Sequence, residues 1–428
     1  MARPRIIILG SCDTKLGETL FLRNQITKSG EAEALLVDVG HIPVQNDQID
    51  VTNLELAARR SVDAAASLAE LSRAEYIKYM IECATPFVEE LYQKDQIHGI
   101  VSAAGSSGTS LATAVMRNAL PIGFPKLMVS TMASGDVKHL IEETDITLMY
   151  SVVDIAGTNF ILNQILTNAA GAIAGAATAY YQSQSKPHAE GESQRKKRIG
   201  ITMFGVTTPC ADAIRSHLVS NYAYEVYVFH ATGSGGKAME RLVREKQLDA
   251  VLDITTTEIA DEVVGGVLSA GPQRLTAAAQ AGIPQVVSVG ACDMVNFGPR
   301  DTVPPEFTSA GNKRILFEHN PAVTLMRTTP EECVLIAGFI ASALQDHVVR
   351  PDLVKVLLPT GGISMIATPS QPFYHPESDA ALFETLEKRL DGSGIEVRRD
   401  DRAINDKDFA LLAAESLVEL IRKTEAEK

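Results

Sequence analysis

The sequence is poor in the features that would place it outside a reducing compartment. Its five cysteines form no CxxC pair and are odd in number, which argues against a disulfide framework and a structural zinc site. The first apolar run, residues 6–9, is too short for a secretion signal, and we expect no stretch long enough to span a membrane. We therefore predict a cytoplasmic protein with no membrane partner and no metal ligand set.

Positive charge is also in short supply. The chain has 39 Lys and Arg against 53 Asp and Glu, a net charge of −14. A nucleic-acid backbone needs a basic face, so nucleic acid is excluded as a bulk partner, whereas a local basic pocket for a nucleotide is not. Apolar residues make up 45% of the 428 residues, which is enough for sizeable cores and predicts two or three domains.

Short β-branched segments alternate with helical patterns through the first half of the chain. Strands are predicted at 5–9, at 33–39, at the start of 99–111, at 126–129 and at 146–151, and a helix over 61–92 with a break near Pro86. Such alternation predicts a parallel, doubly wound sheet, whose ligands bind beyond the carboxyl ends of the strands. Small polar turns follow four of these strands, at 10–15, 38–41, 103–110 and 130–136. Their convergence predicts a binding site at one edge of the sheet.

The second half repeats this rhythm after a polar, basic stretch at 182–197, which we predict to be a linker. Strands are expected at 198–203, 225–229, 250–254, 285–289 and 355–358, and a closing helix at 404–423. The predicted fold is α/β, with two Rossmann-like lobes at 1–181 and 198–428 that face a cleft, each a mostly parallel sheet flanked by helices. Residues 155–181 are rich in small side chains, which favours either a core helix or a helix at a dimer or inter-domain contact.

The segment at 99–111, GIVSAAGSSGTSL, predicts a strand, a turn of small residues and the start of a helix. Gly105 and Gly108 allow close approach of the backbone, and the hydroxyls of Ser106, Ser107 and Thr109 can cap the helix. The first amides of such a helix favour phosphate. An ordinary strand-to-helix turn explains the same residues equally well, and no GK[ST] follows, so both interpretations stay open.

Two further motifs are compatible with phosphate binding. Asp13, Thr14 and Lys15 follow the first predicted strand, where a lysine can serve as a point charge; on its own, a helix cap followed by a surface lysine is the simpler interpretation. The segment at 233–238 fits GxGxxA, and Asp253 ends the next strand, as in a dinucleotide fingerprint. Its strand is not the first of its unit, so it supports a dinucleotide-dependent oxidoreductase only weakly.

Four residues in the second lobe are candidates for catalysis. His230, Glu258, Asp293 and His319 all lie at or beyond predicted strand ends, where they could form an acid–base or metal cluster. Each of them taken alone is more often a structural residue. Cys210 and Cys292 are candidate nucleophiles that have no histidine neighbour in sequence. Arg327, inside the polar 317–332 segment, is a further candidate.

The order of motifs along the whole chain resembles that of the Tm-1-like family, also called UPF0261. The motifs are GSCDTK, AAGSSGTSL, LPIGFPKLMVSTMASGD, VDIAGTN, MFGVTTPC, HATGSGGKAMERL, FEHNPAVTLMRTT and LPTGGIS. The resemblance implies two Rossmann-like lobes that dimerise and bind ATP. It places the ATP site on Asp13, Thr14, Lys15, Gly105, Ser106, Ser107, Gly108, Thr109, Ser130 and Thr131. Family members often have GGSGGT in the glycine turn, and Ala103, Ala104 and Ser107 depart from it here.

The resemblance and the polar turns together favour a cytoplasmic, homodimeric ATP-binding protein. We expect an ATP-dependent enzyme whose small-molecule substrate, of unknown identity, meets the nucleotide in the cleft; whether Mg²⁺ accompanies ATP stays open. The alternative is a regulatory or binding protein that senses ATP without catalysis, and a dinucleotide-dependent oxidoreductase is the third hypothesis. Plant relatives carry an additional TIM-barrel-like domain, so a separate TIM-barrel protein is a candidate partner.

Overall fold

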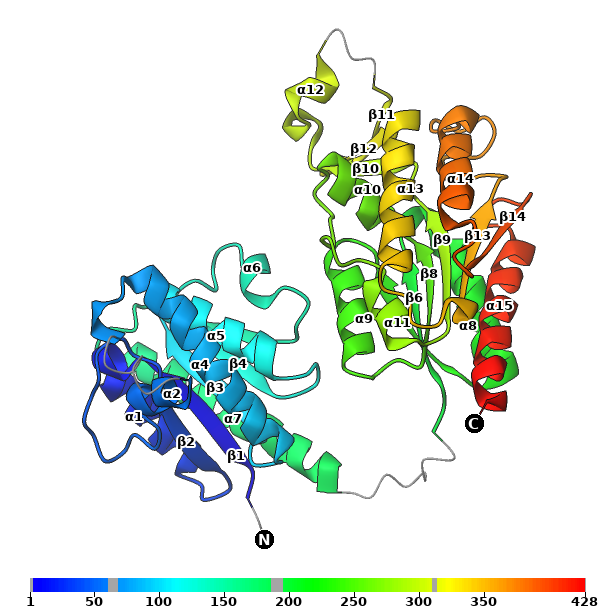
Figure 1. Cartoon of the computed structure of the whole chain (residues 1–428). Coiled ribbons are helices and arrows are strands. Elements are labelled where there is room, and N and C mark those ends of the chain that lie inside the picture. Colours follow the sequence, from blue (N-terminus) through cyan, green and yellow to red (C-terminus); the bar gives the residue numbers. More distant parts are fainter. Residues whose placement is uncertain (1–2, 61–67, 186–194, 310–313, 428) are drawn as a thin grey trace. The chain divides into compact units, whose positions relative to one another are not determined.

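The chain forms two compact α/β units, Met1–Gly191 and Glu192–Lys428, each built on a parallel sheet flanked by helices (Figure 1). The computed structural model describes residues 3–60, 68–185, 195–309 and 314–427. The predicted fold class is therefore confirmed. The division between the units falls inside the 182–197 stretch, although the last helix of the first unit continues to Ser185.

The first unit has a five-stranded parallel sheet in the order β2-β1-β3-β4-β5. Its strands are β1 (Arg5–Gly10), β2 (Glu33–Asp38), β3 (Gly99–Ala104), β4 (Lys126–Ser130) and β5 (Thr147–Tyr150). After β1 the chain builds outward to β2 and then returns to the other side of β1 to form β3. The order of strands thus reverses between β1 and β3, and open α/β sheets bind ligands at such a switch point.

Helices cover both faces of this sheet because successive side chains of a strand point to opposite faces. Ile6 and Ile8 pack under α1 (Cys12–Thr27) and α7 (Phe160–Ser185). Ile7 and Leu9 pack under the helices of the other face, which are α2 (Asn53–Arg60), α4 (Arg73–Gln93) and α5 (Ser106–Ala119). Two short elements are also described in this unit, η1 (Leu68–Glu70) and α6 (Lys138–Ile141).

The helix α4 shows one wrong prediction, because the sequence pattern suggested a break near Pro86. The helix runs through Pro86 without interruption. It begins at a complete capping box made by Ser72 and Glu75, and buried side chains lie on both sides of the proline, including Met80 and Phe87. Tertiary packing of these residues outweighs the single helical hydrogen bond that proline removes.

The helix α7 corrects a second expectation. By length and composition alone, one of the described helices, Phe160–Gln184, is apolar enough to cross a membrane, with a mean hydropathy of 1.3. The prediction that no stretch is long enough was therefore wrong. A third of the most apolar 18-residue stretch of this helix is buried, and residues such as Leu162 and Leu166 pack against the sheet and α1. A helix that packs one stripe into a core and a helix that spans a membrane can both lack charged residues, so length and composition do not separate the two.

The second unit has a six-stranded parallel sheet in the order β14-β13-β9-β8-β6-β7. The strands are β6 (Arg198–Met203), β7 (Glu225–His230), β8 (Ala250–Thr255), β9 (Gln285–Gly290), β13 (Val354–Pro359) and β14 (Glu396–Asp400). A small antiparallel sheet, which the sequence analysis did not predict, joins β10 (Met294–Phe297), β12 (Val323–Arg327) and β11 (Leu316–Asn320). Its strands are too short, and too mixed in polarity, to stand out as a period-two pattern.

Two layers of helices again enclose the sheet, as the clusters of buried side chains show. One face carries α8 (Thr208–Tyr222) and α15 (Lys407–Ala426), and the other carries α9 (Ser234–Arg244), α10 (Thr257–Val264), α11 (Thr276–Ala281), α13 (Pro330–Gln345) and α14 (Pro376–Leu390). The remaining short elements are η3 (Gly205–Thr207), η4 (Arg300–Thr302), α12 (Pro305–Thr308) and η5 (Pro351–Leu353). The switch point of this sheet lies between β6 and β8.

Candidate functional site

A cavity of about 550 Å³ lies at the carboxyl edge of the first unit's sheet, at the switch point between β1 and β3. Eight of the residues predicted to bind ATP line it: Asp13, Thr14, Lys15, Gly105, Ser106, Ser107, Gly108 and Thr131. The turns after β1, β3 and β4 therefore converge here, as parallel strands require. A volume of this size suits a ligand as large as a nucleotide.

The amino terminus of α5 opens onto this cavity without a cap. Gly105 is its N-cap residue, none of the described side chains caps the helix, and the first turn contains no acid. The first helical amides have no carbonyl partner in any α-helix, and their partial positive charge attracts anions. A Cβ on Gly108 would stand 2.6 Å from the Cβ of Ala104, so the packing of this turn requires glycine there.

The beginning of α1 supplies the charged side chains of the cavity. Lys15 leaves helical geometry, with φ −136° and ψ 30°, and its ammonium donates to the carbonyl oxygen of Ile155. Asp13 accepts from the amides of His41 and Ile42 at 3.0 and 3.2 Å, which ties α1 to the turn after β2. A Cβ on Gly40 would stand 2.6 Å from the Asp13 carboxylate, so this turn also depends on glycine.

Two of the predicted ATP residues, Thr109 and Ser130, lie beneath the cavity lining. Both are fully buried, and their hydroxyls share a hydrogen bond of 2.7 Å. Ser130 also accepts from the amide of Met132 at 2.9 Å. These residues join the turn after β3 to the turn after β4, so they position the site rather than face a ligand.

Asp38 is a third buried positioning residue. Its Oδ1 accepts from the amides of Cys12 and Gly40 at 3.0 and 2.8 Å, while Oδ2 has no hydrogen-bond partner among the described residues. Burial raises the pKa of this carboxyl to about 6, although the two amides oppose the shift. One side chain thus fixes the turns after β1 and β2 on either side of the cavity.

The remaining wall comes from residues that the sequence analysis missed. Arg73, Tyr76 and Ile77 of α4 line the cavity together with His41. The His41 and Tyr76 rings lie 4.3 Å apart, and the Tyr76 hydroxyl donates to the carbonyl of Gly40. The helical pattern of α4 was recognised, but the sequence contained no signal for which of its faces meets the edge of the sheet.

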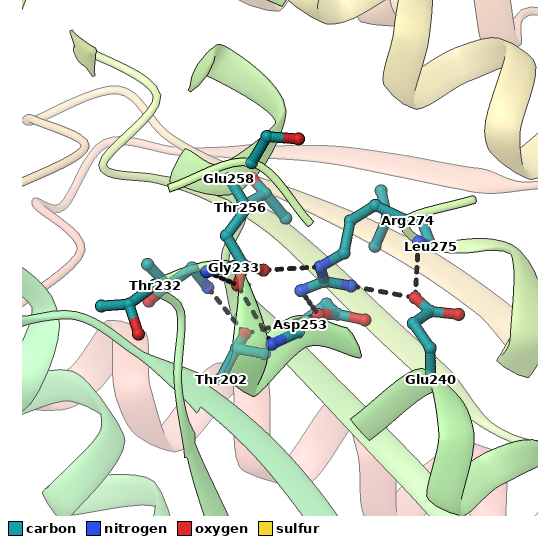
Figure 2. A network of polar contacts seen from close by, with 12 residues as sticks. Thr202, Thr232, Gly233, Glu240, Asp253, Thr256, Glu258, Arg274 and Leu275 are labelled. Atoms are coloured by element: carbon teal, nitrogen blue, oxygen red, sulfur yellow. Dashed lines mark hydrogen bonds and ion pairs between the residues drawn. The ribbon is translucent and has the colours of Figure 1, made fainter. Parts of the chain in front are cut away.

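In the second unit, Glu258 belongs to a buried ionic network (Figure 2). Figure 2 shows the Arg274 guanidinium reaching between Glu258, Asp253 and Glu240, with ion pairs of 2.8 Å to Glu258 and 3.1 Å to Glu240. Burial raises the pKa of Glu258, and Arg274 opposes that shift. Because its carboxylate is paired and enclosed, Glu258 is held as a structural group.

The same carboxylate fills the glycine turn that resembles a dinucleotide fingerprint. Glu258 Oε1 accepts from the amides of Gly233 and Gly236 at 2.7 and 3.0 Å. A Cβ on Gly235 would stand 1.9 Å from the carbonyl oxygen of His230, so tight packing accounts for that glycine. The amides on which a pyrophosphate would sit are therefore already bonded, which argues against the oxidoreductase hypothesis.

The other predicted catalytic residues lie apart. Asp293 is fully buried and accepts from the Ser364 hydroxyl at 2.8 Å, and burial raises its pKa to about 6. His319 is exposed near the far end of the β11–β12 pair, four residues from the end that contacts Asp293, or about 14 Å at ~3.4 Å per residue. His230 is exposed and stacks on Phe204. The predicted four-residue cluster is thus distributed over separate places.

The remaining candidates from the sequence are also structural in this fold. Cys210 and Cys292 are buried, and burial raises the pKa of both thiols, which disfavours the nucleophilic thiolate. Arg327 is buried, pairs with Asp379 and donates to the carbonyl of Phe373 at 2.7 Å. Its contacts join β12 to α14.

Comparison with known proteins covers nearly the whole chain. The model described as the N-terminal domain of the uncharacterised protein family UPF0261 matches residues 4–182, and that of its C-terminal domain matches residues 196–421. A UPF0261 protein of Clostridium tetani is 43% identical over 98% of this chain and 99% of its own length. The alignment with a solved UDP-N-acetylglucosamine 2-epimerase covers 72% of this chain and 82% of the epimerase chain. Its identity of 13% and TM-score of 0.18 are too low to support an inference about this chain.

Tomato proteins are also similar. The ToMV resistance protein Tm-1 of Solanum lycopersicum is 37% identical over 98% of this chain, which spans 56% of the tomato protein. A tomato protein named for susceptibility to the same virus is equally similar, so similarity at this level does not distinguish resistance from susceptibility. The expected resemblance is confirmed: the chain belongs to the UPF0261 family.

Proposed function

We propose that the first unit is an ATP-binding module, with the triphosphate on the amino terminus of α5 and against the ammonium of Lys15. One observation carries the proposal: an uncapped helix terminus opens onto a cavity of about 550 Å³ that a lysine also lines. Helix amides and a lysine are the two groups that recur in phosphate sites. The expectation of an ATP site was drawn from family resemblance, and the geometry supports it independently.

The rest of the cavity accommodates the rest of the nucleotide. Tyr76, Ile77 and Leu111 provide an apolar wall suited to a base, and Arg73 adds a second positive charge. Asp154 lines the same cavity and is a carboxylate that can hold a water of Mg²⁺, which binds mainly through the phosphates. ATP with Mg²⁺ is therefore the expected ligand.

Whether ATP is turned over separates two forms of this function. An ATP-dependent enzyme acting on a small metabolite needs acid–base groups that face a ligand. Of the four predicted groups, Glu258 and Asp293 are buried and hydrogen-bonded within the second unit, and His230 and His319 are exposed at separate places in it. This placement favours the second form, an ATP-sensing binding or regulatory protein that works without catalysis.

Calorimetric titration of the full chain with ATP and Mg²⁺, with NADH as the comparison, tests the proposal. We expect one ATP per chain and no NADH binding. Lys15→Met should weaken ATP binding about tenfold, the loss typical of one charge-assisted hydrogen bond. Lys28→Met is the matched control, because Lys28 is exposed at the far end of α1. Equal affinities in the two variants would reject the assignment of the site.

A further inference from the structure

The segment between β5 and α7, residues 151–159, is fastened to α1 at two points. The Lys15 ammonium donates to the carbonyl of Ile155, and the amide of Gly157 donates to Glu18 Oε1 at 2.6 Å. Lys15 and Glu18 both reach residues 155–157, so the two side chains lie on the same side of α1. Glu18 is 4% exposed, which makes its bond a buried, charge-assisted one.

The fastened segment contains a strained residue. Val152 has φ +62°, in the left-handed region that β-branched residues rarely occupy. Hydrogen bonds of 2.6 and 2.7 Å between Ser151 and Val153 close the turn around it. Such a conformation persists only where surrounding contacts hold it, and the two contacts with α1 anchor the part of the segment that follows.

One of the two contacts uses the side chain that a phosphate would attract. Lys15 lines the cavity, as does Asp154, the neighbour of Ile155. A backbone carbonyl is a neutral acceptor, whereas a phosphate oxygen carries charge and forms a stronger bond with an ammonium. Glu18, by contrast, has its bond with Gly157 on the buried side of α1.

We infer that Lys15 responds to a bound polyphosphate. Its ammonium leaves the carbonyl of Ile155 and binds the polyphosphate, which loosens the 151–159 segment and the first turn of α7. The inference rests on the proposed ATP site and adds a means by which occupancy changes the protein elsewhere. Glu18 remains as the other attachment, so the segment stays on α1 but opens more often. The affected helix is the last element of the first unit along the chain.

Hydrogen exchange of the full chain, read by mass spectrometry with and without ATP and Mg²⁺, tests the inference. We expect ATP to slow exchange at the amides of Ser106, Ser107 and Gly108. We also expect it to speed exchange at Gly157 by about tenfold, because the segment then opens against one attachment instead of two, and loss of one charge-assisted hydrogen bond corresponds to about that factor. In Lys15→Met, Gly157 should exchange rapidly without ATP. ATP added at a concentration high enough to protect the α5 turn of this variant should cause no further change at Gly157.

Glu18 provides the matched control for the other point of attachment. Glu18→Ala removes the acceptor of Gly157 but leaves Lys15 in place, so ATP should still speed exchange in residues 153–156. Glu18→Gln keeps a carbonyl oxygen as acceptor and should restore slow exchange at Gly157. These two variants separate general loosening of the segment from the exchange of partners at Lys15.

A fluorescence measurement gives a second readout, because the chain contains no tryptophan. Phe160 is 77% exposed at the start of α7, so Phe160→Trp introduces a single fluorophore there without removing a buried contact. The anisotropy of this tryptophan should fall on addition of ATP. It should stay constant in the double variant that carries both Lys15→Met and Phe160→Trp.

The outcomes distinguish the inference from the function on which it rests. Protection of the α5 turn with unchanged or slower exchange at Gly157 would overturn the inference and leave the ATP site standing. Absence of protection at the α5 turn, with no heat of binding, would reject the ATP site and the inference with it. Faster exchange at Gly157 that persists unaltered in Lys15→Met would also overturn the inference.

Discussion

The two units place glycine-rich turns at the carboxyl edges of similar sheets, yet treat the adjoining helix termini in opposite ways. In the first unit the start of α5 opens onto a cavity. In the second unit Glu258 accepts from the amides of the turn before α9. At the switch point of the second unit, between β6 and β8, the hydroxyls of Thr207 and Thr255 hydrogen-bond to each other at 2.7 Å. The same local pattern is therefore an open turn beside a cavity in one unit and part of the core in the other.

What decides between these outcomes is a carboxylate supplied from elsewhere in the fold. Glu258 comes from α10, and Arg274 holds it in place. An internal carboxylate and an external phosphate satisfy the same amides, so one excludes the other. Three variants test the comparison. One removes Arg274, the cation that holds Glu258 in the turn of the second unit, one adds an acid at Gly105 in the open turn, and one removes the charge of Asp38 beneath the open turn.

The largest effect is expected from Arg274→Met in the second unit. This variant leaves Glu240, Asp253 and Glu258 buried without their cation, and breaking a buried ion pair costs about 3–5 kcal/mol. The free energy of unfolding of the second unit, measured by urea denaturation at pH 7, should fall by that amount.

ATP binding by the first unit should be retained in Arg274→Met, since the cavity contains no residue of the second unit among those that line it. Arg244→Met is the control, because Arg244 is exposed at the end of α9. A second unit that keeps its stability in Arg274→Met would show that the filled turn does not depend on the buried network.

Filling the open turn should produce the next largest effect. Gly105→Asp places an acid at the N-cap of α5, where the backbone conformation is extended and the nearest atom to a Cβ is 3.9 Å away. The new carboxylate should compete with phosphate for the helix amides. We expect ATP affinity to fall about thirtyfold, while the cap stabilises the helix by about 1 kcal/mol.

Calorimetry and thermal unfolding measure these two effects of Gly105→Asp together. Gly105→Asn is the control, since it caps the helix without adding charge and should lower ATP affinity less. If the aspartate variant binds ATP as tightly as the original chain, the α5 terminus is not the phosphate site.

The smallest effect concerns Asp38 and depends on pH. Its folded pKa, about 6, lies above its ordinary value of 3.8, so the folded state binds the proton more tightly than the unfolded state. The stability that this group contributes is thus complete below pH 3.8 and is lost as the pH rises through 6. Asp38→Asn, which keeps an oxygen for Cys12 and Gly40, should be more stable than the original chain by about 1 kcal/mol at pH 8.

Thermal unfolding of both proteins at pH 5 and pH 8 checks the Asp38 prediction. The advantage of Asp38→Asn should shrink at pH 5, where the native carboxyl is mostly protonated. An equal difference at the two pH values would mean that Asp38 does not titrate in this range, and that the two amide bonds alone set its effect.

The sequence was sufficient to predict most of the two main sheets. The β-branched runs of β1, β6 and β8 are apolar because parallel strands are buried on both faces, and that pattern is local. The strand β14, EVRRD, was missed, since an edge strand with exposed charged side chains lacks this signature. The three short antiparallel strands were missed for a related reason, because pairing with distant residues defines them.

By itself, the sequence determined the α/β class, the turns at the strand ends and the positions of Lys15 and the glycine turn, because these follow from local patterns of apolar and small residues. Only the tertiary structure decided which helix terminus is open, since Glu258 reaches the second turn from 22 residues away along the chain. It also decided that Thr109 and Ser130 lie beneath the cavity and that α4 forms its wall. Burial and pairing depend on what the rest of the fold brings alongside a residue, and no local pattern contains that information.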